Sequence, residues 1–483
     1  MNTKLLKQKI LDLAIRGKLT QQLKSDGTAK DLLKQISEQK RESSSTLSSP
    51  RRRGSPSAQS EKTIIPLDKS EAPFEIPANW EWVRLNDIFN FIDYRGMTPE
   101  KVDKGVPLIT AKNVKKGYID FSIDEYISEE SYAARQGRGS PQKGDILFTT
   151  EAPLGNVALA GIDKYSPGQR IITFQQYTKE KLLDNRFFVF FFLSDLFQNL
   201  LVDQKTGTTV TGIKAAKLKM IPVLLPPLAE QQRIVKKIQE AFTEIDSIEN
   251  NKELLKTHIK QARQKILDLA IHGKLVPQNK ADEPASVLLE RITRDNPHYE
   301  KIEDGPFEIP ENWVWCKLGD LSESIQYGYN APAKDSGRIK MVRISDIHEN
   351  EVEWDSVPYC DIDEKEIQTY LLKKNDILFA RTGGTVGKSF IVSNLPEDAV
   401  YAGYLIRTRY GKNANAQYMK YFMESNLYWE QLRDGCIATA QPNCNGKTLG
   451  KMQIPLPPLN EQSRIVAKIE ELFTELDLIL QNT

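Results

Sequence analysis

Loops in both halves of this 483-residue chain carry the residue types that contact nucleic acid. Arginine, lysine, asparagine and glutamine hydrogen-bond to base edges, whereas lysine and threonine hold phosphates. The candidates in the first half are Lys112, Asn113, Lys115, Lys116, Arg135, Arg138, Lys143, Lys205, Thr208, Thr209 and Lys214. The candidates in the second half are Tyr327, Tyr329, Asn330, Lys334, Arg338, Arg343, Arg381, Thr382, Lys388, Gln441, Asn443, Asn445 and Lys447. A single residue of this kind is most often only solvated, and it is their recurrence in equivalent loops of both halves that favours a nucleic-acid surface.

No catalytic constellation accompanies these loops. Residues 381–389 (RTGGTVGKS) resemble a phosphate-binding loop, but three residues separate Gly383 from Gly387 where that motif has four. A turn that presents basic side chains to a ligand is the better interpretation. The four histidines lack the spacing of a zinc site. The sequence therefore predicts a binding protein with no catalytic residue, no metal ligand and no cofactor of its own.

The candidate loops belong to a chain that repeats itself in tandem. Four blocks recur in the same order in the two halves. They are KILDLAIRGKL (9–19) and KILDLAIHGKL (265–275), PFEIPANWEW (73–82) and PFEIPENWVW (306–315), GDILF (144–148) and NDILF (375–379), and PPLAEQQRIV (226–235) and PPLNEQSRIV (457–466). Shared order at nearly constant spacing predicts two copies of one unit, roughly 1–250 and 251–483.

Heptad-spaced apolar residues flank each copy. From Ile234 to Leu269, ten of eleven positions spaced alternately four and three residues apart are apolar, which is typical of a coiled-coil seam. A pair of prolines precedes this helix, and Gly273 is its expected C-cap. The two ends of the chain repeat the two halves of the seam. Each copy is therefore expected to be a half-helix, a globular body and another half-helix, with two antiparallel rods related by a pseudo-twofold axis.

The bodies combine strand-like and helical segments. Residues 106–114 and 339–347 alternate as strands do, and the apolar run at 187–193 predicts a buried helix. We therefore expect an α+β fold class, with two tandem α/β domains separated by long antiparallel coiled-coil helices in a pseudo-twofold internal repeat. The predicted segments are an N-terminal half-helix (1–20), a partly flexible linker (21–72), domain one (73–225), the central long helix (226–275), a linker (276–305), domain two (306–456) and a C-terminal helix (457–483).

Composition narrows the class of protein. The 66 Lys and Arg residues against 65 Asp and Glu residues exclude a histone-like coat, and the 40% apolar content excludes a long disordered chain. No run approaches the roughly 18 apolar residues of a membrane span, so no membrane partner is expected. Four cysteines without close pairing, and no signal-peptide core, predict a cytoplasmic protein with reduced thiols.

The duplicated KILDLAI-GKL, PFEIP-NW-W and PPL-EQ-RIV blocks, the last leading into heptads, resemble the specificity subunit of type I restriction-modification enzymes. The resemblance covers nearly the whole chain. It implies that both bodies are target-recognition domains, each reading one half of a bipartite, asymmetric site in double-stranded DNA. It further implies a non-catalytic subunit of a phage-defence system. Two methyltransferase subunits and two restriction (motor) subunits are its expected partners, and S-adenosylmethionine, ATP and Mg are expected on them.

A Glu-Gln pair recurs at the start of each rod, at Glu230-Gln231 and Glu461-Gln462. One hypothesis is that these residues, with neighbouring helix faces, dock the two methyltransferase subunits. The alternative is simple first-turn placement of an acid, which the helix dipole favours. For the whole chain, two other functions stay open: a coiled-coil scaffold that reads no DNA bases, and a free-standing DNA methyltransferase or nuclease.

Overall fold

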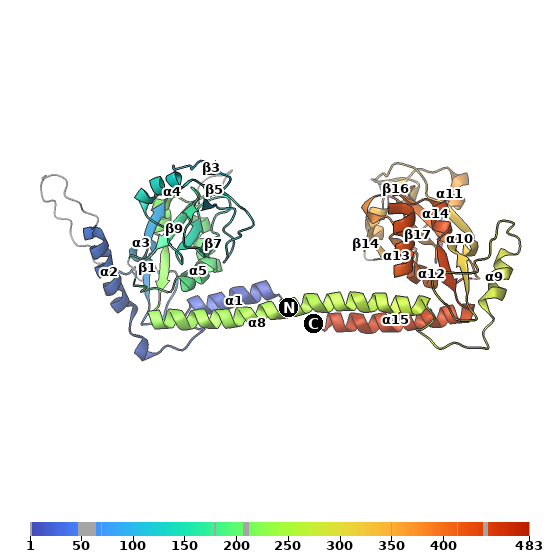
Figure 1. Cartoon of the computed structure of the whole chain (residues 1–483), viewed down its shortest axis with the longest axis horizontal. Helices are drawn as coiled ribbons and strands as arrows, with labels where there is room; N and C mark the ends of the chain where they lie inside the picture. Colours follow the sequence, from blue (N-terminus) through green and yellow to red (C-terminus); the bar gives the residue numbers. More distant parts are fainter. Residues whose placement is uncertain are drawn as a thin grey trace. The chain divides into compact units, whose positions relative to one another are not determined.

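The computed structural model describes residues 2–46, 64–68, 70–177, 180–205, 212–348, 350–412, 414–437 and 443–482. The chain divides into two compact units, Met1–Asn250 and Asn251–Thr483. The boundary lies inside helix α8 (Leu228–Ile271), close to where the second copy of the sequence repeat begins. Figure 1 colours both units along the chain.

Unit one places its long helices at both ends of its sequence and its strands between them. Its helices are α1 (Thr3–Ile15), α2 (Ala29–Thr46), α3 (Leu85–Ile88), α4 (Glu129–Arg135), α5 (Asn185–Leu193), α6 (Asp195–Gln204), α7 (Ala215–Lys219) and the first part of α8. Its strands are β1 (Glu81–Arg84), β2 (Asn90–Asp93), β3 (Lys101–Val102), β4 (Val106–Ile109), β5 (Tyr126–Ile127), β6 (Ile146–Thr149), β7 (Val157–Leu159), β8 (Ser166–Pro167), β9 (Ile171–Gln175) and β10 (Pro222–Leu225).

Helix α1 lies antiparallel to the first part of α8 (Figure 1). Lys7 of α1 forms an ion pair with Asp246, whereas Gln22, in the loop after α1, donates a hydrogen bond to Glu230. The contact from α1 is therefore made far along α8, and the contact from the loop after α1 is made near the start of α8. The two helices run in opposite directions. The expected pairing of long helices is confirmed within this unit.

Two four-stranded sheets and a two-stranded ribbon form the body of unit one. The sheet with the longer strands, here called the larger sheet, has the order β2-β9-β6-β7. All neighbouring strands in it are antiparallel. The second has the order β3-β5-β4-β8, with β4 and β8 parallel. The ribbon pairs β1 with β10, so that Glu81 lies opposite Leu225. Because β10 leads into α8, the ribbon joins the body to the helices.

The apolar run of the sequence forms α5, as predicted, and packs on the larger sheet. Phe192 of α5 lies 5.6 Å from Phe174 of β9, between ring centroids, and Phe174 lies 5.6 Å from Phe148 of β6. All three rings are fully buried. Burying a phenylalanine side chain stabilises the fold by about 1.5–3 kcal/mol, so this cluster holds the sheet and α5 together.

Unit two repeats this plan. Its helices are the rest of α8, α9 (Ala285–Thr293), α10 (Leu318–Leu321), α11 (Glu364–Tyr370), α12 (Ala416–Phe422), α13 (Asn426–Leu432), α14 (Gly446–Gly450) and α15 (Leu459–Gln481). Its strands are β11 (Val314–Lys317), β12 (Ser324–Tyr327), β13 (Ile339–Val342), β14 (Ile347–His348), β15 (Glu351–Val352), β16 (Tyr359–Cys360), β17 (Ile377–Ala380), β18 (Ser389–Ile391), β19 (Ala399–Tyr401), β20 (Leu405–Arg409) and β21 (Gln453–Leu456). The larger sheet, β12-β20-β17-β18, and the ribbon β11-β21 correspond to those of unit one.

Helix α15 lies antiparallel to the second part of α8. Arg263 of α8 pairs with Asp477 at 2.5 Å, and Gln278, beyond α8, donates to Glu461 at 2.5 Å. The second antiparallel pair is therefore also as predicted.

Two predicted features are less extensive in the structure than expected: the length of two strands and the burial of the heptad seam. Strands β4 and β13 end after four residues, because Asn113 and Asp346 accept hydrogen bonds from the backbone N–H groups of Thr110 and Arg343 and turn the chain. The heptad seam is also not buried throughout, since Ile248 is 45% exposed.

Among the described residues, no single helix is long and apolar enough to cross a membrane. The pair α5–α6 meets the length and composition requirement only when both helices are counted together, and they are bent by 68°. The phenylalanines of α5 pack in the core.

Candidate nucleic-acid interface

One end of the larger sheet in unit two gathers polar and aromatic side chains. We call this surface polar edge 2, and it consists of Tyr327, Arg381, Thr382, Tyr404, Asn443 and Asn445. The Arg381 guanidinium carbon lies 4.7 Å from the centre of the Tyr327 ring. The backbone N–H of Arg381 donates to the Tyr404 carbonyl, and Thr382 forms a β-bridge with Asn443. Four segments far apart in sequence therefore meet here.

Short helix α14 is held against this surface. The Tyr327 hydroxyl accepts a hydrogen bond from the Gly446 N–H at 2.9 Å, and Asn445 caps the helix by accepting from the Thr448 N–H at 2.9 Å. Asn443 and Lys447 are exposed. Tyr404 is 66% exposed, so its ring is accessible to a ligand.

The corresponding end of the sheet in unit one carries different side chains. We call it polar edge 1, and it consists of Lys112, Glu151, Gln169, Arg170 and Lys214. Glu151 forms a β-bridge with Gly212, as Thr382 does with Asn443. The Thr150 N–H donates to the Arg170 carbonyl, as Arg381 does to Tyr404. The two polar edges therefore share one backbone frame and differ in their chemistry.

Arg170 and Glu151 form an ion pair at 2.9 Å, with about half of each side chain exposed. An exposed pair of this kind is worth about 0–1 kcal/mol, so either partner can be exchanged for a ligand. Next to it lies a cavity of about 350 Å³ lined by Lys112, Gln169 and Arg170. The lining also includes Glu125, so a ligand placed there would meet cationic, amide and carboxylate groups.

Part of the predicted set falls in these two edges. The predicted residues brought together are Lys112 and Lys214 in unit one, and Tyr327, Arg381, Thr382, Asn443, Asn445 and the adjoining Lys447 in unit two. Thr208, Thr209 and Gln441 lie outside the described residues.

Asn113 and Arg135 are buried, at 3% and 2% exposure. The Asn113 amide donates to the carbonyls of Asp120 and Ile123, and Arg135 donates to those of Met97 and Pro167. In this structure both side chains hold loops together and are not available to a base edge. The sequence shows that both residues are polar and lie in loops, but it does not show that they are buried.

Other predicted residues are exposed or half-buried and have partners nearby in the same unit. The pairs are Lys115 with Asp120 (3.8 Å), Lys143 with Asp163 (3.6 Å), Lys334 with Asp361, Arg338 with Glu364 (3.2 Å) and Arg343 with Asp346 (2.7 Å). Arg138 donates to the carbonyl of Arg95 at 2.7 Å, and the Tyr329 ring packs 5.2 Å from that of Tyr370. Lys116, Lys205, Asn330 and Lys388 are exposed.

Four residues of the polar edges were not among those predicted from the sequence: Glu151, Gln169, Arg170 and Tyr404. All four lie where the larger sheet ends, just after β6 or just before β9 and β20. Aligning the GDILF and NDILF blocks places residue 151 opposite Thr382, and this was the available signal. Arg170 and Tyr404 have no repeated block beside them, so only the paired strands reveal that they are equivalent.

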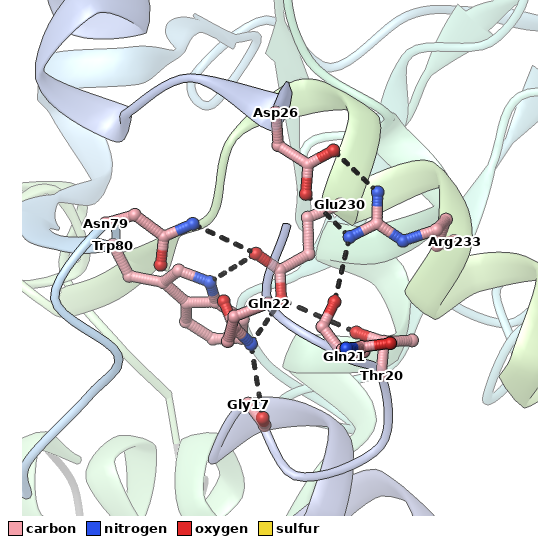
Figure 2. Close-up of polar contacts among 9 residues, drawn as sticks. All are labelled: Gly17, Thr20, Gln21, Gln22, Asp26, Asn79, Trp80, Glu230 and Arg233. Carbon is pink, nitrogen blue, oxygen red and sulfur yellow. Dashed lines mark hydrogen bonds and ion pairs between the residues drawn. The ribbon is translucent and has the colours of Figure 1, made fainter. Parts of the chain in front are cut away.

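The two Glu-Gln pairs do not lie on the surface. Glu230, Gln231, Glu461 and Gln462 are all 0% exposed. Figure 2 shows the Glu230 carboxylate enclosed by Thr20, Gln22, Asn79 and Trp80. A direct contact of these four side chains with a partner protein is incompatible with that burial. Any docking surface has to use neighbouring exposed residues of the helices.

A buried aspartate that precedes β6 in unit one and β17 in unit two has different partners in the two copies. Burial raises the pKa of Asp145 in unit one to about 6, although the Gln142 N–H and the Gln175 amide both donate to its Oδ2. In unit two the corresponding Asp376 pairs with Arg409 at 2.6 Å, and this contact raises the pKa of Arg409.

We expect Asp145→Asn to stabilise unit one at pH 8 by about 1–3 kcal/mol, since each pKa unit is worth about 1.4 kcal/mol. The folded pKa lies above the ordinary value of 3.8, so the protonated form contributes stability that is present below 3.8 and is lost as the pH rises through about 6. An asparagine oxygen keeps both donors without the charge. Thermal unfolding between pH 4 and 8 measures the effect.

Asp163→Asn is the control, because that side chain is 85% exposed. It should leave the pH dependence unchanged. Equal destabilisation by Asp145→Asn at pH 5 and pH 8 would show that the charge of Asp145 is not what limits stability.

Comparison with known proteins places these features in one family. Residues 77–257 and 310–482 match the family described as "Type I restriction modification DNA specificity domain". The chain is 24% identical to the type I restriction enzyme EcoAI specificity subunit of Escherichia coli, over 97% of this chain and 89% of that protein. It is 25% identical to the EcoKI specificity subunit of Escherichia coli strain K12, over 84% of each.

A solved structure shares the fold. It comes from work described as the structural basis of complex assembly and conformational transition of the type I R-M system. With a TM-score of 0.56 and 19% identity, the similarity covers 85% of this chain and 94% of that one. The two matched segments span most of the chain, and each lies largely within one of its two copies. The chain belongs to the type I restriction modification DNA specificity domain family.

Proposed function

We propose that this chain is the DNA-specificity subunit of a type I restriction-modification complex. It has no catalytic role of its own, and each of its two domains reads one half of a bipartite, asymmetric DNA site. The observation that carries the proposal is the pair of polar edges, which present different side chains on the same backbone frame. Two readers with one frame and different chemistry suit two different half-sites.

The chemistry of each edge suits base reading. In polar edge 2, the Arg381 fork suits guanine, and Asn443 offers an amide of the type that suits adenine. The exposed Tyr404 offers an apolar face, which suits contact with a thymine methyl group or a sugar. In polar edge 1, Glu151 can accept from the cytosine amino group, and Lys112, Arg170 and Lys214 can hold phosphates.

The partners follow from the same proposal. Two methyltransferase subunits and two restriction subunits would assemble with this chain in the cytoplasm. S-adenosylmethionine, ATP and Mg would be bound by those subunits. The chain itself would supply DNA reading and a scaffold of paired helices whose exposed faces are open to partners.

We expect Arg381→Ala to weaken binding of the assembled complex to its DNA site by about 5- to 150-fold, the effect of losing one bidentate contact of about 1–3 kcal/mol. Only one half-site should lose discrimination. Competition binding between the methylated motif and duplexes altered in either half measures this, after methylation mapping of the host genome has defined the motif.

Two variants sharpen the test. Arg381→Lys keeps the charge, so it should restore affinity if Arg381 contacts a phosphate and should fail to restore it if Arg381 reads guanine. Arg291→Ala removes an exposed arginine of α9, paired with Glu283 at 2.8 Å, and should leave binding unchanged. Equal loss of discrimination in both half-sites would contradict the assignment of one half-site to each domain.

A further inference from the structure

Three of the four repeated sequence blocks meet at one place in unit one. The KILDLAI-GKL block brings Gly17 against Pro77 of the PFEIP block so closely that a Cβ on Gly17 would lie 2.4 Å from the proline ring. Trp80, three residues after Pro77, reaches Glu230 of the PPL-EQ block. The contact joins residues 150 positions apart. We call Gln22, Trp80, Glu230 and Gln231 anchor cluster 1.

Glu230 is the centre of this cluster (Figure 2). Its Oε2 accepts from the Trp80 indole N–H at 2.8 Å, and its Oε1 accepts from the Gln22 amide at 2.6 Å. Thr20 and Asn79 donate at 3.4 and 3.5 Å. A buried carboxylate is stable only when hydrogen bonds replace its lost hydration, so these donors hold it in one position.

The neighbouring side chains tie further elements to the start of α8. The Gln231 Oε1 accepts from the backbone N–H of Asp184, the N-cap of α5, at 2.9 Å. Arg233 pairs with Asp26, in the segment after α1, at 2.6 Å, and this contact lowers the pKa of Asp26. The first turns of α8 thus hold the α1 loop, the start of the body and the core helix α5.

Unit two builds the same arrangement from Gln278, Trp313, Glu461 and Gln462, here called anchor cluster 2. Trp313 donates to Glu461 at 3.0 Å and Gln278 donates at 2.5 Å. Gln462 accepts from the N–H of Asn415, the N-cap of α12, at 2.8 Å. The repeat thus retains this cluster, while the polar edges differ.

The clusters lie where a body joins its helices. The junction of unit one also contains the ribbon β1-β10, which runs into α8 through two prolines. Apolar side chains of α1 and α8 share one buried core with α5, which holds the helices to the body without hydrogen bonds. A two-stranded ribbon twists and bends easily, so it does not by itself fix the angle between body and helices. The buried Glu230 and Gln231 contacts add fixed points on both sides of the ribbon.

We propose that anchor clusters 1 and 2 determine which gap lengths the protein accepts between its two half-sites, by holding each domain at one angle to its helices. This inference rests on the proposed function. The residues of the clusters act as positioning residues in this inference, because the tryptophan, glutamate and glutamine at the centre of each cluster are buried inside its unit. A domain whose angle to its helices can vary would accept half-sites at more than one spacing, while still reading the same bases.

The test replaces one indole with a ring that cannot donate. Trp80→Phe removes a hydrogen bond to the buried Glu230 carboxylate, and losing such a bond shifts a conformational equilibrium by about tenfold or more. We expect methylation mapping to find the wild-type half-sites also at gaps one base pair longer or shorter. Trp313→Phe should behave in the same way.

Trp82→Phe is a matched control in the same segment. The Trp82 indole donates to the Phe74 carbonyl at 3.1 Å, outside the cluster, so this variant should keep a single gap length. Trp315→Phe, which removes a bond to the Phe307 carbonyl at 3.3 Å, is the equivalent control in unit two. Gln22→Ala removes the 2.6 Å donor from an exposed loop and decides the question if Trp80→Phe does not fold.

The outcomes separate this inference from the proposed function. If the wild-type complex methylates no bipartite motif, the proposed function fails. If it methylates one gap length, and Trp80→Phe and Gln22→Ala methylate only that motif, even at a lower rate, the clusters are merely structural and the inference is overturned. New gap lengths with unchanged half-sites support it.

Discussion

Exchanging residues 73–225 for the matching segment of a relative with a different DNA site will change one half of the methylated sequence and leave the other half unchanged. The physical reason is that unit one forms its own core and carries polar edge 1 within this segment. The residues of polar edge 2 all lie outside it. Methylation mapping of cells that express the hybrid with its methyltransferase partner measures the result.

The junctions of this exchange suit a transplant. The segment begins just before β1 and ends with β10, and Glu81 lies opposite Leu225 in the ribbon between them. Its first strand and its last strand are therefore paired with each other. The donor segment has to carry a tryptophan at position 80, because Glu230 outside the segment needs its indole donor.

The reciprocal exchange of residues 306–456 is the control, and it should change the other half only. A hybrid in which both halves change would mean that the two domains do not read independently. A recovered active hybrid with an unchanged motif would place the base-reading residues outside 73–225.

Inserting four residues into α8 after Asn251 will change the gap between the half-sites and leave both half-site sequences intact. Helix α8 is continuous from Leu228 to Ile271, and four residues add about 6 Å and slightly more than one turn. This length is close to two base-pair steps of DNA. Asn250 and Asn251 are exposed, so the insertion disturbs no buried side chain at that point.

Insertion of the same residues after Gly161 provides the control. Gly161 lies in an exposed loop, and a Cβ placed on it would meet nothing within 4 Å. That variant should keep the original gap. Methylation mapping reads both variants, and an unchanged gap in an active α8 variant would refute the idea that helix length sets the spacing.

The sequence predicted the frame of this protein well, because the frame rests on periodic patterns. Heptad-spaced residues such as Ile234 and Ile238 are buried in unit one, and both antiparallel helix pairs form as the pattern indicated. The apolar run became α5. Such patterns are local, and burying an apolar face against a partner is their main physical requirement.

The candidate site was harder to predict, because residue type does not report exposure. Asn113 and Arg135 have the chemistry of DNA-contacting residues, yet both donate their hydrogen bonds to backbone carbonyl groups of the protein. Arg170 and Tyr404 could also contact DNA, but no repeated block lies beside them in the sequence. Their place in the polar edges depends on strand pairing across the larger sheet.

The sequence by itself determined that the chain is one unit written twice, with two bodies between long helices. The repeated blocks indicate the duplication, and the heptad spacing indicates the long helices. Only the tertiary structure decided what the repeated Glu-Gln pairs do, since their partners are distant in sequence: Trp80 lies 150 residues from Glu230 and Trp313 lies 148 residues from Glu461. Burial turns such a carboxylate from a solvated helix-end charge into a fixed acceptor that needs every donor around it.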